Sequence, residues 1–277
     1  MSSTEPSPNF KSCYKTIRLI GQGGYGKVWL SVRLSNSKLY AVKIVPDSKC
    51  RRKTFCGTRE EFVSDEVVLW ESLSHPNIVK LEEVFLEDGH WILVMEFRDG
   101  YRDLFSMTAR GTVFSEKDAA NIIRQVIEVC SYLISEEVDH RDLKDENILY
   151  HPVTKQIKLI DFGSASFLEE DRYTGMQGTE VYIPPEFFNH GSYHPMAGMV
   201  WSIGCLAYVL VTGSCPFNSK TEVMEHKEVK WADYKVGPLY RDFVDRCLER
   251  VELLRCDLFK LQFHPLIRRA AETSNRG

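Results

Sequence analysis

The spacing of apolar residues along the chain changes near residue 96. From Tyr14 to about Leu93, apolar and polar residues alternate between turn signals such as SNSK and EDGH, which is typical of antiparallel strands. Residues 60–73, EEFVSDEVVLWESL, interrupt this alternation with apolar residues at helical spacing and predict a single helix. Beyond residue 100 the helical period dominates, and we predict helices at 115–134, 198–212, 221–229 and 239–250.

These patterns predict an α+β fold of two lobes. The N-lobe (14–95) is a small antiparallel β-sheet with one main helix, and a hinge (96–102) leads to a larger, mostly α-helical C-lobe (103–268). We expect residues 1–13 to form a disordered arm because the chain begins with the polar, Ser- and Pro-rich MSSTEPSPN. Residues 269–277 are expected to form a tail.

Composition narrows the class of protein. A chain of 277 residues, 43% of them hydrophobic, can bury a large core, and its formal net charge of −4 argues against a nucleic-acid partner held by a broad basic surface. Its eight cysteines show no zinc-site spacing, and no signal peptide begins the chain, so we expect a reducing compartment, the cytoplasm and/or the nucleus. The longest apolar run, 200–211, is short for a bilayer and predicts a buried helix without a membrane partner.

A glycine-rich stretch, GQGGYGKV, occupies residues 21–28. A single G-x-G-x-x-G is weak evidence because glycines gather in many ordinary turns. Strand-like segments flank this one on both sides, which favours a glycine-rich hairpin folded over a triphosphate rather than the strand-to-helix turn of a dinucleotide site. The ordinary turn stays open at this point.

Lys43 lies among apolar neighbours in the predicted strand LYAVKIV. A lysine in such a strand commonly extends its ammonium group from a sheet edge into water. The functional alternative is a cation on phosphate oxygens, held by a carboxylate. Glu66, on the one helix of this lobe, is the best candidate for that partner.

The stretch HRDLKDEN, residues 140–147, combines acids, bases, a histidine and an amide that are costly to bury. A run of charges is usually a solvated helix face. A second motif, Asp161-Phe162-Gly163, follows the apolar strand KLI, and Asp-x-Gly alone is an ordinary turn signal. If Asp161 lies within reach of Asn147, however, the two side chains provide the oxygen ligands that magnesium prefers.

In this order and spacing, the motifs resemble those of eukaryotic serine/threonine protein kinases, over about residues 14–268. The resemblance implies transfer of the γ-phosphoryl group of ATP to Ser/Thr hydroxyls of protein substrates, with Mg²⁺ and a monomeric chain. It implies that Asp142 orients the substrate hydroxyl, that Lys144 neutralises the moving phosphoryl group, and that Lys43 and Glu66 form an ion pair. Asn147 and Asp161 would hold the metal, and the residues implied to bind ATP are Ile20, Gly21, Gln22, Gly23, Gly24, Tyr25, Gly26, Val28, Ala41, Lys43, Glu96, Asp103, Leu149 and Ile160.

Within this family the chain is most similar to PIM kinases, with PAS-domain kinase next, in the calcium/calmodulin-kinase-type group. Segments such as GTEVYIPPEFF carry the likeness, and Glu186 is expected to pair with Arg255. Substrates would contact Asp145, Glu146 and Thr179, the two acids taking a substrate arginine. Thr174 could be phosphorylated and then pair with Arg141. The PIM-like alternative is constitutive activity without phosphorylation in this loop.

Two departures from the family pattern bear on activity. Met199 stands where most kinases have an aspartate, although PIM kinases also lack that acid, and Asp139 stands where an apolar residue is usual. They leave a second hypothesis, a pseudokinase acting as an ATP-binding scaffold. A small-molecule kinase is disfavoured by the segment G-T-x-x-Y-x-P-P-E, which is similar to a peptide-docking segment.

Overall fold

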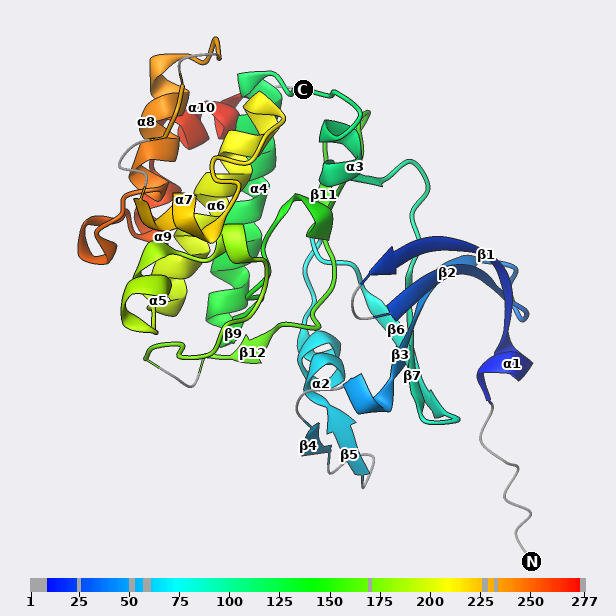
Figure 1. Cartoon of the computed structure of the whole chain (residues 1–277). Coiled ribbons are helices and arrows are strands. Elements are labelled where there is room, and N and C mark those ends of the chain that lie inside the picture. The colour runs from blue at the N-terminus through cyan, green and yellow to red at the C-terminus, as the bar shows by residue number, and fades with distance from the viewer. Residues whose placement is uncertain are drawn as a thin grey trace, which may run out of the picture. The chain divides into compact units, whose positions relative to one another are not determined.

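The computed structural model describes residues 9–23, 26–49, 53–56, 61–168, 171–225, 229–231 and 234–274. The chain divides into two compact units (Figure 1): Met1–Ser74 with Val79–Asp99, and His75–Ile78 with Gly100–Gly277. The first is a sheet with one main helix and the second is mostly helical. The predicted α+β fold is confirmed.

The first unit is built on a five-stranded antiparallel sheet in the order β1-β2-β3-β7-β6. Its strands are β1 (Tyr14–Gly23), β2 (Gly26–Arg33), β3 (Leu39–Pro46), β6 (Leu81–Glu87) and β7 (His90–Glu96). The 3₁₀ turn η1 (Asp47–Lys49) and a small hairpin, β4 (Lys53–Cys56) with β5 (Glu61–Ser64), precede the helix α2 (Asp65–Ser72). The helix expected over 60–73 therefore begins at Asp65, because residues 61–64 pair as a strand instead.

One face of this sheet is covered by the start of the chain. Phe10, in the four-residue helix α1 (Phe10–Cys13), is buried and packs with Tyr14, Tyr40 and Val42. The rings of Phe10 and Tyr14 stack with centroids 5.3 Å apart. The expectation of a disordered arm is thus wrong for residues 9–13: an aromatic side chain that covers an apolar face orders the segment, whereas residues 1–8 lie outside the described residues.

The second unit contains helices around the buried helix α6 (Pro195–Thr212). By length and composition α6 is the one candidate membrane span in the described part of the chain, but 83% of it is buried inside the fold, as in a core helix. The other helices are α3 (Leu104–Thr108), α4 (Glu116–Ser135), α5 (Pro185–His190), α7 (Lys220–Glu225), α8 (Pro238–Cys247), α9 (Leu258–Leu261) and α10 (Pro265–Ser274). As expected, Ser115 caps α4: its Oγ accepts from the N–H of Asp118.

The second unit also contains short strands and 3₁₀ turns between its helices. A three-stranded sheet joins β8 (Arg102–Asp103), β10 (Ile148–Tyr150) and β11 (Ile157–Leu159), and β9 (Val138–Asp139) pairs with β12 (Ser166–Phe167). The 3₁₀ turns are η2 (Asp145–Asn147), η3 (Glu180–Tyr182) and η4 (Glu252–Leu254).

Several expected boundaries differ from those observed. The division between the units falls after Asp99, inside the expected hinge, and residues 75–78 belong to the second unit, where Asn77 Nδ2 donates to Gln125 Oε1 and the carbonyl of Ile157. The expected tail is wrong up to residue 274, because α10 continues that far. The helix expected over 221–229 ends at residue 225, with 226–228 outside the description, and that over 239–250 ends at residue 247.

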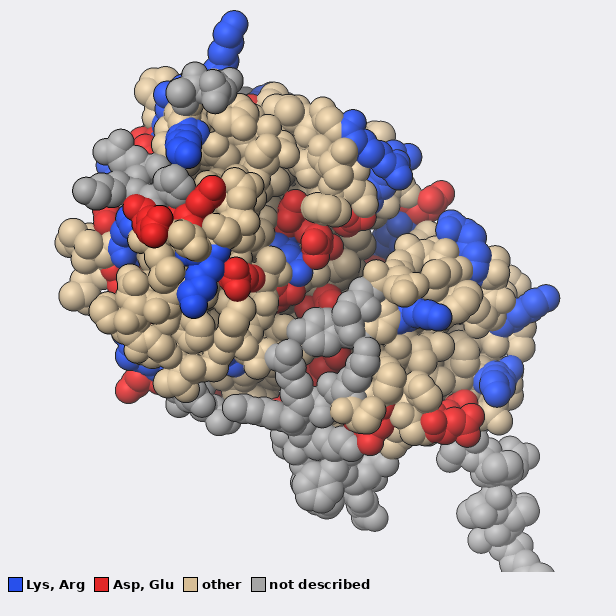
Figure 2. Space-filling model, in the orientation of Figure 1, with Lys and Arg blue, Asp and Glu red and all other residues tan. Residues whose placement is uncertain are grey.

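Charges of both signs are mixed on the surface. Figure 2 shows Lys and Arg interspersed with Asp and Glu on the face that it draws, in keeping with a formal net charge of −4. No broad basic field covers the described residues of this face.

Candidate active site

Lys43 and Glu66 form a buried ion pair in the first unit. Lys43 lies in the middle of β3 and Glu66 in the first turn of α2, and Nζ is 2.6 Å from Oε1. Only 6% of the Lys43 side chain and 10% of the Glu66 side chain are exposed, so water and salt screen this attraction little. The predicted pairing of the two residues is confirmed.

The glycine motif joins two antiparallel strands, as the sequence predicted. Gly21 is paired with Val28 and Gly23 with Gly26 across β1 and β2, while Gly24 and Tyr25 lie outside the described residues. Val28 is in turn paired with Lys43 across β2 and β3. Directly paired residues face the same side of a sheet, so Val28 and Lys43 share one face.

Ala41 lies two residues before Lys43 on β3 and therefore faces the same side. Ile20, Val28 and Ala41 are all partly exposed, unlike the fully buried Val42 on the opposite face. An apolar face that is left partly open beside a lysine suits an adenine ring and its phosphates.

The carboxylate of Asp142 is held in the second unit by three side chains. Asn147 Nδ2 donates to Oδ2 at 3.0 Å and to the Asp142 carbonyl at 2.8 Å, and Lys144 Nζ lies 3.1 Å from Oδ2. Thr179 Oγ1 donates to Oδ1 at 3.0 Å and accepts from Lys144 Nζ at 2.7 Å. A carboxylate fixed from both of its oxygens is preorganised to orient a hydroxyl group.

Lys144 is the cation of this cluster. Burial alone would lower the pKa of its ammonium group, but the carboxylates of Asp142 and Glu146 more than offset burial and raise the pKa. Its Nζ lies 3.0 Å from Glu146 Oε2. Lys144 is therefore charged at neutral pH.

Thr179 reaches Asp142 because a glycine precedes it. Gly178 has φ of 84°, and a Cβ there would lie 2.5 Å from the Arg141 carbonyl oxygen and 3.1 Å from Asp142 Oδ1. Only glycine tolerates both this backbone conformation and this close approach. The sequence pair Gly178-Thr179 thus brings the loop before η3 onto the loop that contains Asp142.

Asn147 and Asp161 lie at one end of the β10–β11 pair. Ile148 pairs with Leu159, and the Asn147 carbonyl accepts from the N–H of Ile160 at 2.9 Å. Asp161 has the unusual φ of 66°, and its Oδ1 accepts from the N–H of Gly163. Asn147 uses its Nδ2 for Asp142, so the oxygen of the same amide is the atom that suits a metal ion.

The side chains of Asn147 and Asp161 can be compared with the ligands that Mg²⁺ prefers. Among the described residues, no three His, Cys, Asp or Glu side chains gather as a metal cage. One carboxylate and one amide oxygen are instead the sparse, oxygen-only protein set with which magnesium binds to a nucleotide, because phosphates and water supply the remaining ligands. Asn147 and Asp161 therefore fit a magnesium ion bound together with a nucleotide.

Of the two acids expected to bind a substrate arginine, Asp145 has another partner. Asp145 is buried and accepts from the hydroxyl of Tyr182 at 3.0 Å, and burial raises the pKa of its carboxyl group. The interpretation of Asp145 as a site for a substrate arginine is therefore not supported, since η2 turns it inward. Half of the Glu146 side chain is exposed, so Glu146 remains the candidate contact for a substrate arginine.

Asp103, expected to contact the ribose, is the N-cap of α3. Its Oδ1 accepts from the N–H of Ser106 at 2.6 Å and its Oδ2 from the Ser106 hydroxyl at 2.8 Å. It is also directly paired with Leu149 across β8 and β10, so these two expected nucleotide contacts lie side by side. Each carboxylate oxygen keeps lone pairs for a further donor.

The two remaining residues expected to contact ATP lie in different units. Ile160, next to Asp161, is partly exposed in the second unit, and Glu96 ends β7 in the first unit.

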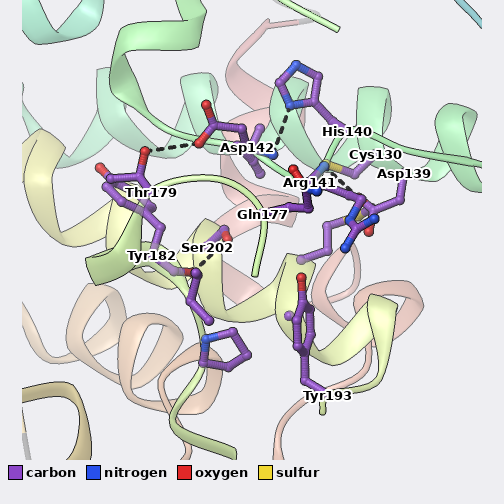
Figure 3. Close-up of a pocket in the computed structure, with 15 residues that line it drawn as sticks. Cys130, Asp139, His140, Arg141, Asp142, Gln177, Thr179, Tyr182, Tyr193 and Ser202 are labelled. Atoms are coloured by element: carbon purple, nitrogen blue, oxygen red, sulfur yellow. Dashed lines mark hydrogen bonds between the residues drawn. The ribbon is translucent and has the colours of Figure 1, made fainter. Parts of the chain in front are cut away.

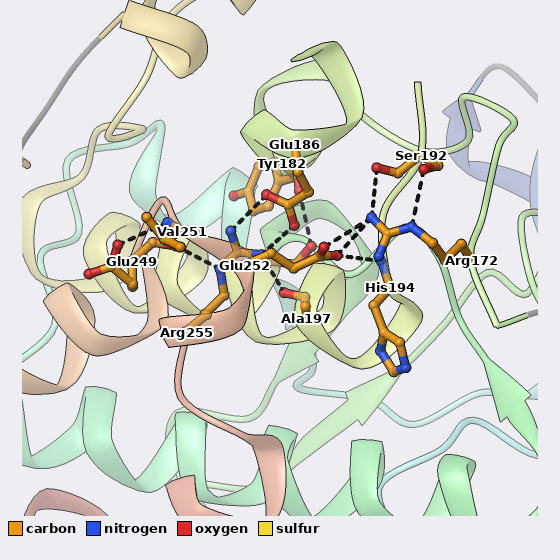
Figure 4. A network of polar contacts seen from close by, with 11 residues as sticks. Arg172, Tyr182, Glu186, Ser192, His194, Ala197, Glu249, Val251, Glu252 and Arg255 are labelled. Carbon is orange, nitrogen blue, oxygen red and sulfur yellow. Dashed lines mark hydrogen bonds and ion pairs between the residues drawn. The ribbon is translucent and has the colours of Figure 1, made fainter. Parts of the chain in front are cut away.

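The segment after Asp161 is tied to the helical unit by a polar network (Figure 4). Arg172 Nη2 lies 2.9 Å from Glu252 Oε2 and its Nε donates to Ser192 Oγ, while Glu252 Oε1 accepts from the N–H of His194 at 2.6 Å. Glu186 and Arg255 form a buried bidentate pair at 2.7 and 2.8 Å, which confirms their predicted pairing.

Comparison with known proteins agrees with this arrangement. The pattern of the protein kinase domain family matches residues 14–267. The chain belongs to the protein kinase domain family. It is 32% identical over 228 residues to serine/threonine-protein kinase pim-2 of Danio rerio, covering 79% of this chain and 74% of that protein.

Two further relatives extend the comparison. Serine/threonine-protein kinase prk-2 of Caenorhabditis elegans is 31% identical over 269 residues, covering 94% of this chain and 59% of that protein. Calcium-dependent protein kinase 4 of Plasmodium falciparum is 34% identical over 248 residues, covering 88% of this chain and 46% of that protein. The chain is a protein kinase domain of the serine/threonine type, homologous to active kinases, and this family uses ATP and a divalent metal.

Sequence reasoning missed three partners of the site. Tyr182 holds Asp145, Glu252 holds Arg172, and the ring of Tyr173 lies under the Arg141 guanidinium, with Cζ 3.9 Å from the ring centroid. A tyrosine or glutamate of this kind carries no local signal, because its partner is distant in the chain.

Proposed function

We propose that this kinase domain is catalytically active and transfers the γ-phosphoryl group of ATP to serine and threonine hydroxyls of protein substrates. The observation that carries the proposal is the Asp142 carboxylate, fixed by Asn147, Lys144 and Thr179. A scaffold that only binds nucleotide needs no such preorganised acceptor.

In the proposed reaction, a bond forms between the substrate hydroxyl oxygen and the γ-phosphorus, and the bond from that phosphorus to the β–γ bridging oxygen breaks. Asp142 orients the hydroxyl and accepts its proton, and ADP leaves with the bridging oxygen. Lys144 neutralises charge on the moving group, and Lys43 holds the phosphates that stay behind. Most of the acceleration then comes from positioning and electrostatics.

Mg²⁺ is the proposed metal, with Asn147 and Asp161 as its protein ligands. When bound, it supplies charge neutralisation on the phosphate oxygens. Asn147 would have two roles: its Nδ2 fixes Asp142, and its Oδ1 would be the metal ligand. The proposed ATP contacts are the residues already named for the glycine hairpin, β3, Glu96, Asp103, Leu149 and Ile160.

The test is transfer of labelled phosphate from ATP and Mg²⁺ to a mixed peptide library. Wild type should label Ser and Thr peptides, and Asp142→Asn should lower kcat by about 10³-fold or more with little change in ATP affinity. Asp88→Asn, the same change at an exposed turn, is the matched control and should behave as wild type. If wild type binds ATP with Mg²⁺ and labels nothing, the pseudokinase reading replaces this one.

We also propose that the domain is active without phosphorylation of its activation segment, the residues between Asp161 and Glu186. The support is the internal network: Arg141 lies over Tyr173, whose backbone pairs with that of Tyr193, and Arg172 is bound to Glu252. Thr174 is exposed and outside this network. Thr174→Ala should then keep wild-type kcat, whereas loss of activity in that variant would favour phosphorylation.

A PIM-like preference for basic substrates is a further part of the proposal and rests on Glu146, which is exposed beside Lys144. Peptides with arginine three and five residues before the acceptor should react faster than their alanine versions, and Glu146→Gln should reduce that difference. Equal rates for both peptide sets in wild type would refute the preference.

We propose further that the domain is a monomer in the cytoplasm and/or nucleus. Its cysteines at 130, 205 and 247 are buried free thiols, which suits a reducing compartment. Sedimentation at micromolar concentration checks the monomer, and a tagged chain in cells checks the compartment.

A further inference from the structure

Asp139 is a buried acid directly before residues 140–147, which we call the catalytic loop. It ends the short strand β9, only 5% of it is exposed, and the apolar core residue Val138 precedes it. An ionised carboxylate at this depth is costly unless partners compensate for lost water. Its partners therefore indicate what it does.

The first partner is a backbone group of the catalytic loop. Asp139 Oδ1 accepts from the N–H of Arg141 at 3.1 Å, two residues later (Figure 3). Such a bond closes an Asx turn, which stabilises unusual backbone conformations. Arg141 needs this support, because its φ of 61° is left-handed and unfavourable for a residue with a Cβ.

The backbone next to this turn, at Asp142, is fixed by a further hydrogen bond. The N–H of Asp142 donates to His140 Nδ1 at 3.4 Å, and the other ring nitrogen of His140 lies 3.0 Å from the Ile160 carbonyl. Asp139 and His140 thus each hold the backbone two residues ahead, and Asn147 holds the Asp142 carbonyl. The side chain of Asp142 is oriented only if this backbone stays in place.

Arg141 and Asp139, which have opposite charges, also line one cavity. A cavity of about 30 Å³ lies beneath the loop, and among its fifteen lining residues Asp139 and Asp142 are the acids (Figure 3). The Arg141 guanidinium contacts the Tyr173 ring and donates to the Gly175 carbonyl, neither of which carries a negative charge. Met199, another lining residue, is apolar.

The groups around Asp139 offset only part of the effect of burial on its pKa. Burial raises the pKa of Asp139, and the N–H and charge of Arg141, with His140 and the hydroxyl of Tyr173, oppose that rise. Asp139 in turn contributes to the raised pKa values of Cys130, Tyr173 and Tyr193, for each of which burial is the larger cause.

We propose that Asp139 is a positioning residue of the catalytic loop. Its carboxylate fixes the left-handed backbone of Arg141 and balances the Arg141 guanidinium, so that Asp142 keeps its orientation without a phosphate on the activation segment. The effect on rate rests on the proposed kinase activity, whereas the hydrogen bond stands independently of it.

Two substitutions separate the functions of the carboxylate. Asp139→Asn keeps an acceptor for the Arg141 N–H and removes the charge, whereas Asp139→Leu removes both with an apolar side chain of similar size. Met199→Leu, a volume-conserving change in the same cavity, is the control for altered packing. The readouts are kcat and KM for ATP and peptide, the melting temperature, and exchange of the Arg141 amide measured by NMR.

We expect Asp139→Leu to lower kcat by about 10²-fold with less than about 3-fold change in KM for ATP, because small misplacement of a catalytic group costs that much. Its Arg141 amide should exchange faster than in wild type. Asp139→Asn should lose less than about 10-fold in kcat and keep the protection. Met199→Leu should match wild type in both respects.

The inference is overturned if Asp139→Leu keeps wild-type kcat, or if its Arg141 amide stays as protected as in wild type. It is also overturned if Asp139→Leu and Met199→Leu lose activity and melting temperature alike, since Asp139 would then serve packing alone. If wild type itself transfers no phosphate, the proposed function fails, and amide exchange still decides the role of Asp139 in the loop.

Discussion

At the scale of single residues, the charges expected to contact phosphate are buried or partly buried beside a counter-charge. Lys43 has Glu66, and Lys144 has Asp142 and Glu146. A buried ion pair contributes little net stability, because desolvation of both charges offsets their attraction. These pairs therefore serve to orient the two ammonium groups, which we propose contact phosphate.

The Lys43–Glu66 pair yields a prediction about rate. Lys43→Met should lower kcat by about 10²-fold or more, because it removes a fixed cation from the phosphates, and Glu66→Gln should lower it about 10-fold by loosening that cation. Phosphate transfer to peptide measures both. Lys38→Met, at an exposed turn, is the control, and full activity of Lys43→Met would show that this lysine is not part of the machinery.

At the scale of elements, the activation segment is anchored at several points along its length. Gly178 and Thr179 dock it on the catalytic loop, Tyr173 pairs with Tyr193, and Arg172 is bound to Glu252 of η4. These anchors support the proposal that the segment is ordered without a phosphate.

The anchor at Glu252 predicts a pH dependence of stability. Burial would raise the pKa of Glu252, but the His194 N–H and the Arg172 guanidinium more than offset it and lower the pKa below its ordinary 4.5. A carboxyl whose folded-state pKa is depressed adds stability that is present above its unfolded-state pKa and is lost as the pH falls through its folded-state pKa.

Glu252→Gln should therefore reduce the free energy of unfolding at neutral pH, with the difference from wild type shrinking as the pH falls below about 4.5. Urea unfolding at a series of pH values measures this difference. Glu180→Gln, at an exposed residue, serves as the control. A difference that stays constant across the series would contradict the ionic tie.

At the scale of the whole molecule, the second unit is held together by contacts between segments far apart in the chain. Glu186 of α5 and Arg255, just after η4, are 69 residues apart and form two hydrogen bonds with almost no exposure. Arg255 also donates to the Ala197 carbonyl of α6 and lies over the Trp201 ring. The pair thus joins three helical segments at one point.

Breaking this pair should destabilise the fold strongly. Glu186→Ala leaves Arg255 buried without its counter-charge and should cost about 3–5 kcal/mol in the free energy of unfolding, measured with urea. The double substitution Glu186→Leu with Arg255→Met should recover part of that loss, because no uncompensated charge remains. A single variant as stable as wild type would show that water reaches the pair.

The sequence by itself determined the class of fold, the order of most elements and the residues of the candidate site. Apolar periodicity is a local property, so it separated the strand-rich part from the helical part. The kinase motifs are local too, and for that reason Lys43, Asp142, Asn147 and Asp161 could be named before any contact was known. Glu66 could be named as the partner of Lys43 because it lies on the one helix of its lobe. The family resemblance supplied the pairing of Glu186 with Arg255.

Only the tertiary structure decided how the local pieces are held. It ordered Phe10 against an aromatic face, turned Asp145 inward onto Tyr182, moved residues 75–78 into the second unit, and gave Asp139 a partner in Arg141. Whether a charge is buried, exposed or paired depends on neighbours brought together by the fold. The spacing of residues along one chain carries no record of those neighbours.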